Sequence, residues 1–191
     1  MNKNKRIILA ITGASGAIYG LRALEILHAL DVEVHLVISP MGAQVLIEET
    51  GKTLPDLQPL AAHSYQPDNL AAPIASGSFA VDGMLILPCS IKTLSGVANS
   101  YADNLITRAA DVCLKEGRPL LLAVREAPLH SGHLHLMAQA SRAGAIIFPP
   151  VPAFYSQPKT IDDLVNATVG RMLARIGIGN NAYHPWEGDT D

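Results

Sequence analysis

The sequence has little charge for its size. Of its 191 residues, 16% are charged and 49% are hydrophobic, so little charged surface is available to cover an isolated globular chain. We therefore expect part of the surface to be buried between subunits. The formal net charge is -3, which gives no electrostatic reason to bind nucleic acid or an anionic membrane. Neither partner is expected.

Cysteines and long hydrophobic runs are also scarce. Cys89 and Cys113 form no CxxC or zinc-ligand pattern, so we interpret both as small core residues and expect a protein of the reducing cytoplasm. No run approaches the roughly 18 consecutive apolar residues of a transmembrane helix. His130, His133 and His135 have no acidic or cysteine ligand beside them to complete a metal site. They are therefore interpreted as polar residues at a helix start, and no metal is expected.

Short apolar runs alternate with helical segments along most of the chain. Five β-branched runs are expected to form strands: "RIILAIT", "VEVHLVIS", "GMLILPC", "PLLLAVRE" and "GAIIFPP". Helices are predicted over residues 19–30, 40–49, 93–116 with a break near 101–104, 134–142 and 161–176. This alternation predicts an α/β fold with a doubly wound parallel sheet and right-handed crossovers.

Two segments interrupt the alternation. Residues 51–80 contain four prolines and the small residues "ASGS", and an excursion of this length is usually functional or packed against a neighbour. The tail, residues 177–191, looks irregular but carries the only tryptophan, Trp186. We therefore expect a single domain over residues 1–176, with the tail packing near the active site or on a neighbouring subunit.

The loop after the first predicted strand is bare. Ligands of parallel sheets bind at the carboxyl ends of the strands, and here Gly13, Ala14, Ser15 and Gly16 let backbone N–H groups approach an anion. The loop lacks the GxGxxG spacing and the Gly-Lys-Ser/Thr ending of a Walker A loop, and no acidic residue ends the second strand to hold an NAD ribose. A mononucleotide fits these absences best. A tight turn that serves packing alone is the alternative.

Two further strands end in polar helix starts. Ser39 followed by Pro40 is explained by helix capping alone, and a ligand contact there is an additional interpretation. The segment after the third predicted strand repeats this placement with two hydroxyls and an ammonium; its residues are Ser90, Ile91, Lys92 and Thr93. Polar helix starts side by side at a switch point favour a ligand that bears a phosphate.

Charged residues also mark this edge of the predicted sheet. Arg125 and Glu126 leave the fourth strand, where charges are seldom needed for packing, so we predict a function for both. Glu49 is more ambiguous because its spacing also fits a solvated carboxylate, and Glu48 is its rival.

The segment "PPVPAFYSQP" combines prolines with aromatic residues. The prolines are expected to hold Phe154 and Tyr155 in a fixed pose that suits a planar or apolar ligand. Arg171 follows in the last predicted helix, where its position alone is typical of the surface.

Taken together, these motifs resemble those of the UbiX-type flavin prenyltransferases. The resemblance covers nearly the whole chain and rests on "TGASGAIYGLR", "ISPMGAQ", "PCSIKTLSGVAN", "VREAPLH" and "PPVPAFY". It implies a flavodoxin-like or Rossmann-like three-layer sandwich, assembled into a homododecamer with FMN between subunits. FMN-dependent decarboxylases related to the cysteine decarboxylases share the fold and the general FMN site, and they are the alternative.

The resemblance implies a reaction. A dimethylallyl group passes from dimethylallyl monophosphate to N5 and C6 of reduced FMN without a metal, and the prenylated FMN serves a UbiD-type decarboxylase. The sequence leaves open whether the donor is a mono- or diphosphate. It also leaves open whether the product serves ubiquinone synthesis or the breakdown of an aromatic acid.

The resemblance also implies roles for single residues. Contacts to FMN fall on Gly13, Ala14, Ser15, Ser39, Ser90, Ile91, Lys92, Thr93 and Arg125. Contacts to the dimethylallyl phosphate fall on Tyr155 and Arg171, with Lys115 as a third, and Trp186 adds an aromatic wall. Proton transfer falls on Ser15, Glu49 and Glu126, with the division between the two carboxylates left open. Pro40 departs from the lysine of many members, which removes any charge contact at that position.

Overall fold

The computed structural model describes residues 5–183, 185 and 188. Its strands are β1 (Arg6–Ile11), β2 (Glu33–Ile38), β3 (His63–Tyr65), β4 (Gly83–Cys89), β5 (Leu120–Val124) and β6 (Ile146–Ile147). Its α-helices are α1 (Ala17–Ala29), α2 (Pro40–Thr50), α3 (Leu54–Leu57), α4 (Ile91–Ala98), α5 (Leu105–Lys115), α6 (Ser131–Arg142) and α7 (Ile161–Arg175). Two short 3-10 helices are η1 (Gln58–Leu60) and η2 (Pro73–Ala75).

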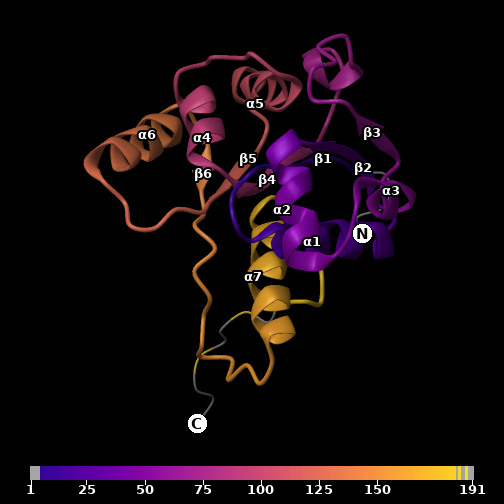
Figure 1. Ribbon diagram of the computed structural model, residues 1–191, viewed down its shortest axis with the longest axis vertical. Coiled ribbons are helices and arrows are strands. Elements are labelled where there is room, and N and C mark those ends of the chain that lie inside the picture. Colours follow the sequence, from indigo (N-terminus) through magenta and orange to yellow (C-terminus); the bar gives the residue numbers. More distant parts are fainter. Residues whose placement is uncertain (1–4, 184, 186–187, 189–191) are drawn as a thin grey trace.

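The described strands form one parallel sheet in the order β3-β2-β1-β4-β5-β6 (Figure 1). The chain winds from β1 toward β3 on one side and from β4 toward β6 on the other. The switch point therefore lies between β1 and β4, where the carboxyl ends of the strands open a crevice for ligands. The predicted doubly wound α/β fold is confirmed.

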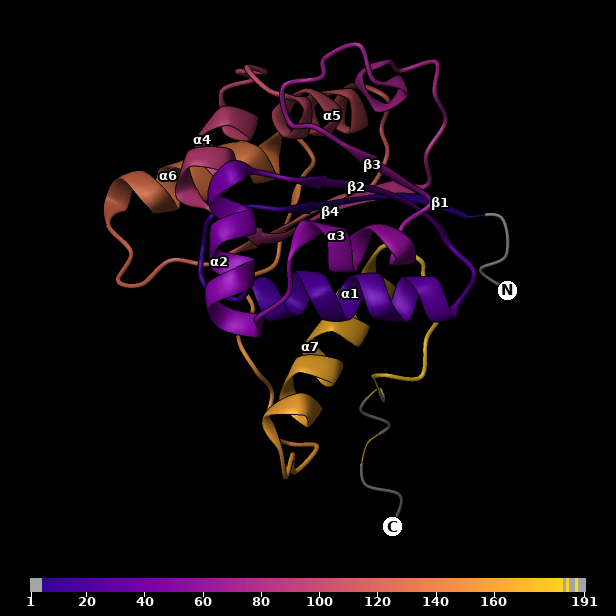
Figure 2. The same ribbon diagram turned by 45° about the vertical axis from the view of Figure 1, so that its right-hand side comes forward.

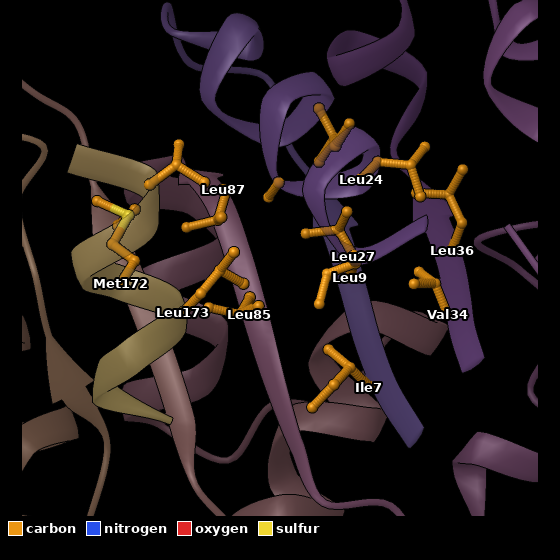
Figure 3. Close-up of a cluster of buried hydrophobic side chains, with 14 of the residues drawn as sticks. Ile7, Leu9, Leu24, Leu27, Val34, Leu36, Leu85, Leu87, Met172 and Leu173 are labelled. Atoms are coloured by element: carbon orange, nitrogen blue, oxygen red, sulfur yellow. The ribbon is translucent and has the colours of Figure 1, made fainter. Parts of the chain in front are cut away.

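Successive side chains of the strands enter two separate hydrophobic cores. In β1, Ile7 and Leu9 face one core, whereas Ile8 and Ala10 face the other. Helices α1 and α7 cover the first core, and Figure 3 shows their leucines and Met172 against the inner strands. Helices α4, α5 and α6 cover the opposite face of the sheet (Figure 2). The result is a three-layer sandwich.

The excursion over residues 51–80 holds α3, η1, β3 and η2. Its last part packs against α5 and the following turn of the same chain. Arg108 donates to the carbonyl oxygen of Ala75 at 3.1 Å, and Arg118 donates to those of Phe79 and Gly77 at 2.8 and 2.7 Å. These bonds fix the excursion beside the sheet, where β3 pairs with β2 as the edge strand.

The two cysteines lie in the core, as expected. Cys89 and Cys113 are free and fully buried. Burial raises the pKa of both thiols, that of Cys113 to about 12, so both stay protonated and unreactive. Among the described residues, no helix combines the length and the apolar character needed to cross a membrane.

Candidate active site

Hydrogen bonds between loops tie the carboxyl ends of β1, β2 and β4 together. The Thr12 hydroxyl donates to the Pro88 carbonyl oxygen at 2.8 Å and accepts from the Ser90 amide at 2.9 Å. The Ser39 amide donates to the Ile11 carbonyl oxygen at 3.0 Å. The loops that sequence analysis singled out therefore meet at the switch point.

We expect Thr12→Val to lower the free energy of unfolding by about 1–3 kcal/mol, because the Ser90 amide loses its acceptor in a half-buried place. Thr12→Ser keeps the hydroxyl and should cost much less. Chemical denaturation of both variants checks this. Equal stability of Thr12→Val and the wild type would contradict the bridging role.

Close packing and backbone conformation explain the two glycines of the loop after β1. A Cβ at Gly13 would collide with the Cβ of Met41 in the first turn of α2. Gly16 has a φ of 103°, a left-handed conformation that favours glycine, and it begins α1 without a side-chain cap. Ser15 is exposed between them. Its hydroxyl is therefore accessible from the edge of the sheet.

The carboxylate of Glu49 occupies the start of α1. Its Oε2 accepts from the amides of Gly16 at 2.9 Å and Ala17 at 2.8 Å, and the helix dipole favours a negative charge there. Glu48 instead accepts from the Gln44 side chain one turn earlier on α2, at 2.9 Å. The geometry thus separates two carboxylates that spacing could not. The Glu49 carboxylate therefore occupies the start of α1, where the sequence predicted that an external anion would bind.

Helices α2 and α4 offer two further helix starts at this edge. The Ser39 hydroxyl accepts from the Gly42 amide at 3.0 Å, and the Ser90 hydroxyl accepts from the Thr93 amide at 3.3 Å. Capping therefore explains both serines locally. Because Glu49 fills the start of α1, these are the two starts that remain at the switch point for an external phosphate.

Arg125 and Glu126 emerge exposed from the end of β5. Burial raises the pKa of the Tyr19 hydroxyl, and the positive charge of Arg125 partly opposes that rise, so the guanidinium lies near this ring. The Glu126 carboxylate accepts from the Ala127 amide at 3.0 Å. Sequence reasoning missed Tyr19. The available signal is an aromatic residue in the first turn of the helix that follows the bare loop.

Tyr155 and Arg171 share a cavity of about 440 Å³. Its walls come from the segment after β6, from α7 and from the described part of the tail; they include Phe148, Val151, Tyr155, Asn166, Arg171 and Tyr183. The Arg171 guanidinium lies 5.9 Å from the centre of the Phe148 ring. A cation, a phenol and apolar side chains thus line one space, which suits an anionic ligand with an apolar part.

Lys115 lies apart from this cavity. It ends α5, and the next segment leads to the amino end of β5, so Lys115 is at the opposite edge of the sheet from the loops described above. Its ammonium pairs with Glu116. Arg108 lies two turns earlier on α5 and puts a second cation on the same face of the helix. One chain alone therefore does not bring Lys115 to Tyr155 and Arg171, and Trp186 lies outside the described residues.

Glu33, His35 and His63 are the one group of three potential metal ligands found among the described residues. The group sits toward the amino ends of β2 and β3, where Glu33 and His35 are already hydrogen-bonded and the His63 ring stacks on that of His35 at 4.9 Å between centroids. Arg6 binds Glu33 at 2.8 Å and lowers the pKa of its carboxyl, while His35 lies within hydrogen-bond distance of both Glu33 and Tyr65. Burial lowers the pKa of His35, which favours its neutral form. We interpret the group as a structural network.

Comparisons with known proteins identify the family. The sequence profile of the Flavoprotein family matches residues 1–173. The flavin prenyltransferase UbiX of Salmonella typhimurium is 54% identical over 187 residues, which cover 96% of this chain and 99% of that protein. The chain belongs to the UbiX family of flavin prenyltransferases.

Solved structures of the UbiX family share this architecture. AnUbiX in complex with FMN and dimethylallyl pyrophosphate matches with a TM-score of 0.95 and 44% identity, covering 97% of this chain and 99% of its own. A dodecameric FMN-dependent UbiX-like decarboxylase from Escherichia coli O157:H7 matches with a TM-score of 0.93 and 44% identity, covering 96% and 100%. An FMN-dependent cysteine decarboxylase from thioviridamide biosynthesis is only 18% identical at a TM-score of 0.63, covering 75% and 89%, which shows the fold alone. The comparisons favour the UbiX family over the decarboxylase alternative.

Proposed function

We propose that the protein transfers the dimethylallyl group of dimethylallyl monophosphate to N5 and C6 of reduced FMN. The observation that carries the proposal is the shared cavity of Tyr155 and Arg171 in a chain of the UbiX family. The complex of AnUbiX with FMN and dimethylallyl pyrophosphate supports a flavin and a prenyl phosphate as the two substrates. Dimethylallyl diphosphate is the competing donor.

In this proposal FMN lies along the carboxyl edge of the sheet. The bare loop, Gly13–Gly16, lets the flavin approach the backbone closely. The flavin phosphate binds at the helix starts of Ser39 and Ser90, because Glu49 already fills the start of α1. Arg125 adds a positive charge from the end of β5.

The donor releases its phosphate when the allylic C–O bond breaks and both electrons of that bond leave with the phosphate. Arg171 neutralises the departing anion, and the Tyr155 hydroxyl donates a hydrogen bond to it. Aromatic faces shelter the positive charge that develops on the allyl group. Because protein groups balance both charges, the proposed reaction needs no metal.

Ring closure at C6 requires a proton to be added to the C=C of the N5-bound allyl group, so that its tertiary carbon can bond to C6, and it then requires the loss of the C6 proton from the flavin ring. A carboxylate within hydrogen-bond reach can take this proton, and Glu49 and Glu126 are the carboxylates of this edge that we propose for proton transfer. We propose that the Ser15 hydroxyl relays a proton, and its exposure beside Gly16, whose amide donates to Glu49, supports this role.

We further propose that FMN lies between subunits of a homododecamer. Lys115 lies at the edge of the sheet opposite to the FMN loops, so a neighbouring copy has to supply it to the donor. Val151 and Phe154, 74% and 67% exposed on the segment after β6, offer apolar surface for such contacts. The dodecameric relative from Escherichia coli O157:H7 supports the same assembly.

Mixed oligomers test this shared site. Lys115→Ala and Arg171→Ala should each be nearly inactive alone, whereas coexpression should restore up to about a quarter of the sites by random assembly. The restored sites combine an intact Lys115 of one copy with an intact Arg171 of another. Activity of doubly tagged, purified oligomers is the measurement. If it does not exceed that of either single variant, the site is not shared in this way.

The proposed reaction is tested by following phosphate release from both prenyl donors under anaerobic conditions. We expect dimethylallyl monophosphate to release inorganic phosphate only when reduced FMN is present. The rival decarboxylase would instead release carbon dioxide from a cysteinyl or aromatic acid without a UbiD-type partner. Release of inorganic phosphate at the same rate with and without reduced FMN would refute the proposal.

We also propose a place for the protein in the cell. Two buried, unpaired cysteines are typical of a protein in a reducing compartment, which supports a location in the cytoplasm. We propose a UbiD-type decarboxylase as the recipient of prenylated FMN. Residues 1–176 form the flavin-binding domain in this proposal, and the tail, residues 177–191, packs near the active site or on a neighbouring subunit. In support, the Asn180 side chain donates to the Gly170 carbonyl oxygen at 2.9 Å, and Tyr183 lines the cavity.

A further inference from the structure

Arg22 joins α1 to the wall of the cavity on α7. Its Nη2 donates to Asp162 Oδ1 at 2.9 Å, its Nη1 donates to Asn166 Oδ1, and its Nε donates to Glu25 at 2.8 Å. The side chain is 21% exposed. Because residues 162 and 166 are one turn apart, a single guanidinium binds two side chains on one face of α7.

The segment that Arg22 binds, the first turns of α7, has fewer buried side chains than the rest of the helix. The first half of α7 extends away from the sheet together with the chain that follows β6 (Figures 1 and 2). Ile161 is 76% exposed, and burial in the core begins only at Val165. Asn166 lines the same cavity as Arg171. The Arg22 fork therefore acts where packing alone does not fix the cavity wall.

We propose that Arg22 is a positioning residue for the prenyl-phosphate site. By holding Asp162 and Asn166, it sets the first turns of α7, where Asn166 lines the cavity beside Arg171, relative to α1, whose start borders the flavin loop. The inference rests on the proposed function, because that function makes the cavity the donor site. It adds a residue that touches neither substrate.

The Arg22→Lys variant keeps the positive charge and removes the planar fork, so it separates the effect of the fork on the position of α7 from the effect of the charge. A lysine ammonium can pair with Asp162, but it lacks the planar fork through which Arg22 reaches Asp162 and Asn166 with separate nitrogens. We therefore expect KM for dimethylallyl monophosphate to rise about tenfold in Arg22→Met and about threefold in Arg22→Lys. The kcat should stay within about twofold and the FMN dissociation constant should not change, because α1 and its loop keep their core contacts.

The experiment measures KM, kcat and FMN affinity for Arg22→Met, Arg22→Lys, Asn166→Ala and the double variant Arg22→Met with Asn166→Ala. Arg175→Met is the matched control, since Arg175 is exposed in the last turn of the same helix, and its KM should equal that of the wild type. The double variant should raise KM by less than the product of the two single effects.

An unchanged KM in Arg22→Met would overturn the inference. So would a rise in KM accompanied by parallel losses of kcat and FMN affinity in Arg22→Lys, because that pattern indicates a general loss of structure. If Arg22→Met does not fold, Arg22→Lys and Asn166→Ala decide by the same criteria. A wild-type protein that makes no prenylated flavin refutes the proposed function instead, so the two failures are distinguishable.

Discussion

Glu49→Gln should slow the prenylation of FMN by about 100- to 10,000-fold, the range expected for the loss of a positioned proton acceptor. The glutamine oxygen can still accept from the Gly16 and Ala17 amides, so the start of α1 should keep its shape. FMN affinity should therefore change little. Single-turnover formation of prenylated flavin, measured beside flavin binding, checks both statements.

Glu48→Gln is the matched control. Glu48 is the preceding residue of the same helix, and its carboxylate accepts a hydrogen bond from Gln44 on the surface of α2. We expect wild-type prenylation from this variant. Equal rates for Glu49→Gln and the wild type would refute the proton-transfer role of Glu49.

Arg171→Ala should lower kcat/KM for dimethylallyl monophosphate by about 100- to 1000-fold, because the departing phosphate loses its charged partner in the cavity. Arg171→Lys should recover part of this loss, since an ammonium keeps the charge without the planar fork. Steady-state kinetics with varied donor and saturating reduced FMN are the measurement.

Arg175→Ala removes a cation one turn further along α7, and it should leave kcat/KM unchanged. An equal loss in both variants would point to general electrostatics rather than a contact with the leaving group. Full activity of Arg171→Ala would remove the cavity from the proposed donor site.

Sequence reasoning predicted the central strands and their connections because those segments are buried on both faces. In β4, every residue from Gly83 to Cys89 is buried, so its apolar run is unmistakable. The edge strand β3 was missed. His63 and Ser64 are exposed, and the strand pairs only with β2, so neither hydrophobicity nor alternation marks it.

Helix boundaries followed capping chemistry more closely than hydrophobic spacing. The predicted break between the fourth and fifth helices is confirmed, and Asn104 caps α5 through bonds to the amides of Ile106 and Thr107. Helix α6 begins at Ser131 rather than Leu134, because the His130 ring accepts from the Gly132 amide at 3.0 Å. The interpretation of His130 as a polar residue at a helix start therefore fits the structure, although the helical spacing pointed to a later first residue.

The candidate site was only partly readable for a different reason. The sequence places residues at strand ends, but the choice between Glu49 and Glu48 depends on how α2 is rotated against the start of α1. The separation of Lys115 from Arg171 depends on which edge of the sheet each helix ends at. The spacing of residues along the chain predicts neither the rotation of α2 nor the edge of the sheet at which a helix ends.

The most direct test of the account is the mass of the flavin recovered after anaerobic incubation with reduced FMN and dimethylallyl monophosphate. We predict a gain of one C5 unit that requires the protein and the donor, and that is nearly lost in Glu49→Gln and Arg171→Ala. Recovery of unmodified FMN with both the monophosphate and the diphosphate donor would contradict the proposed prenyl transfer.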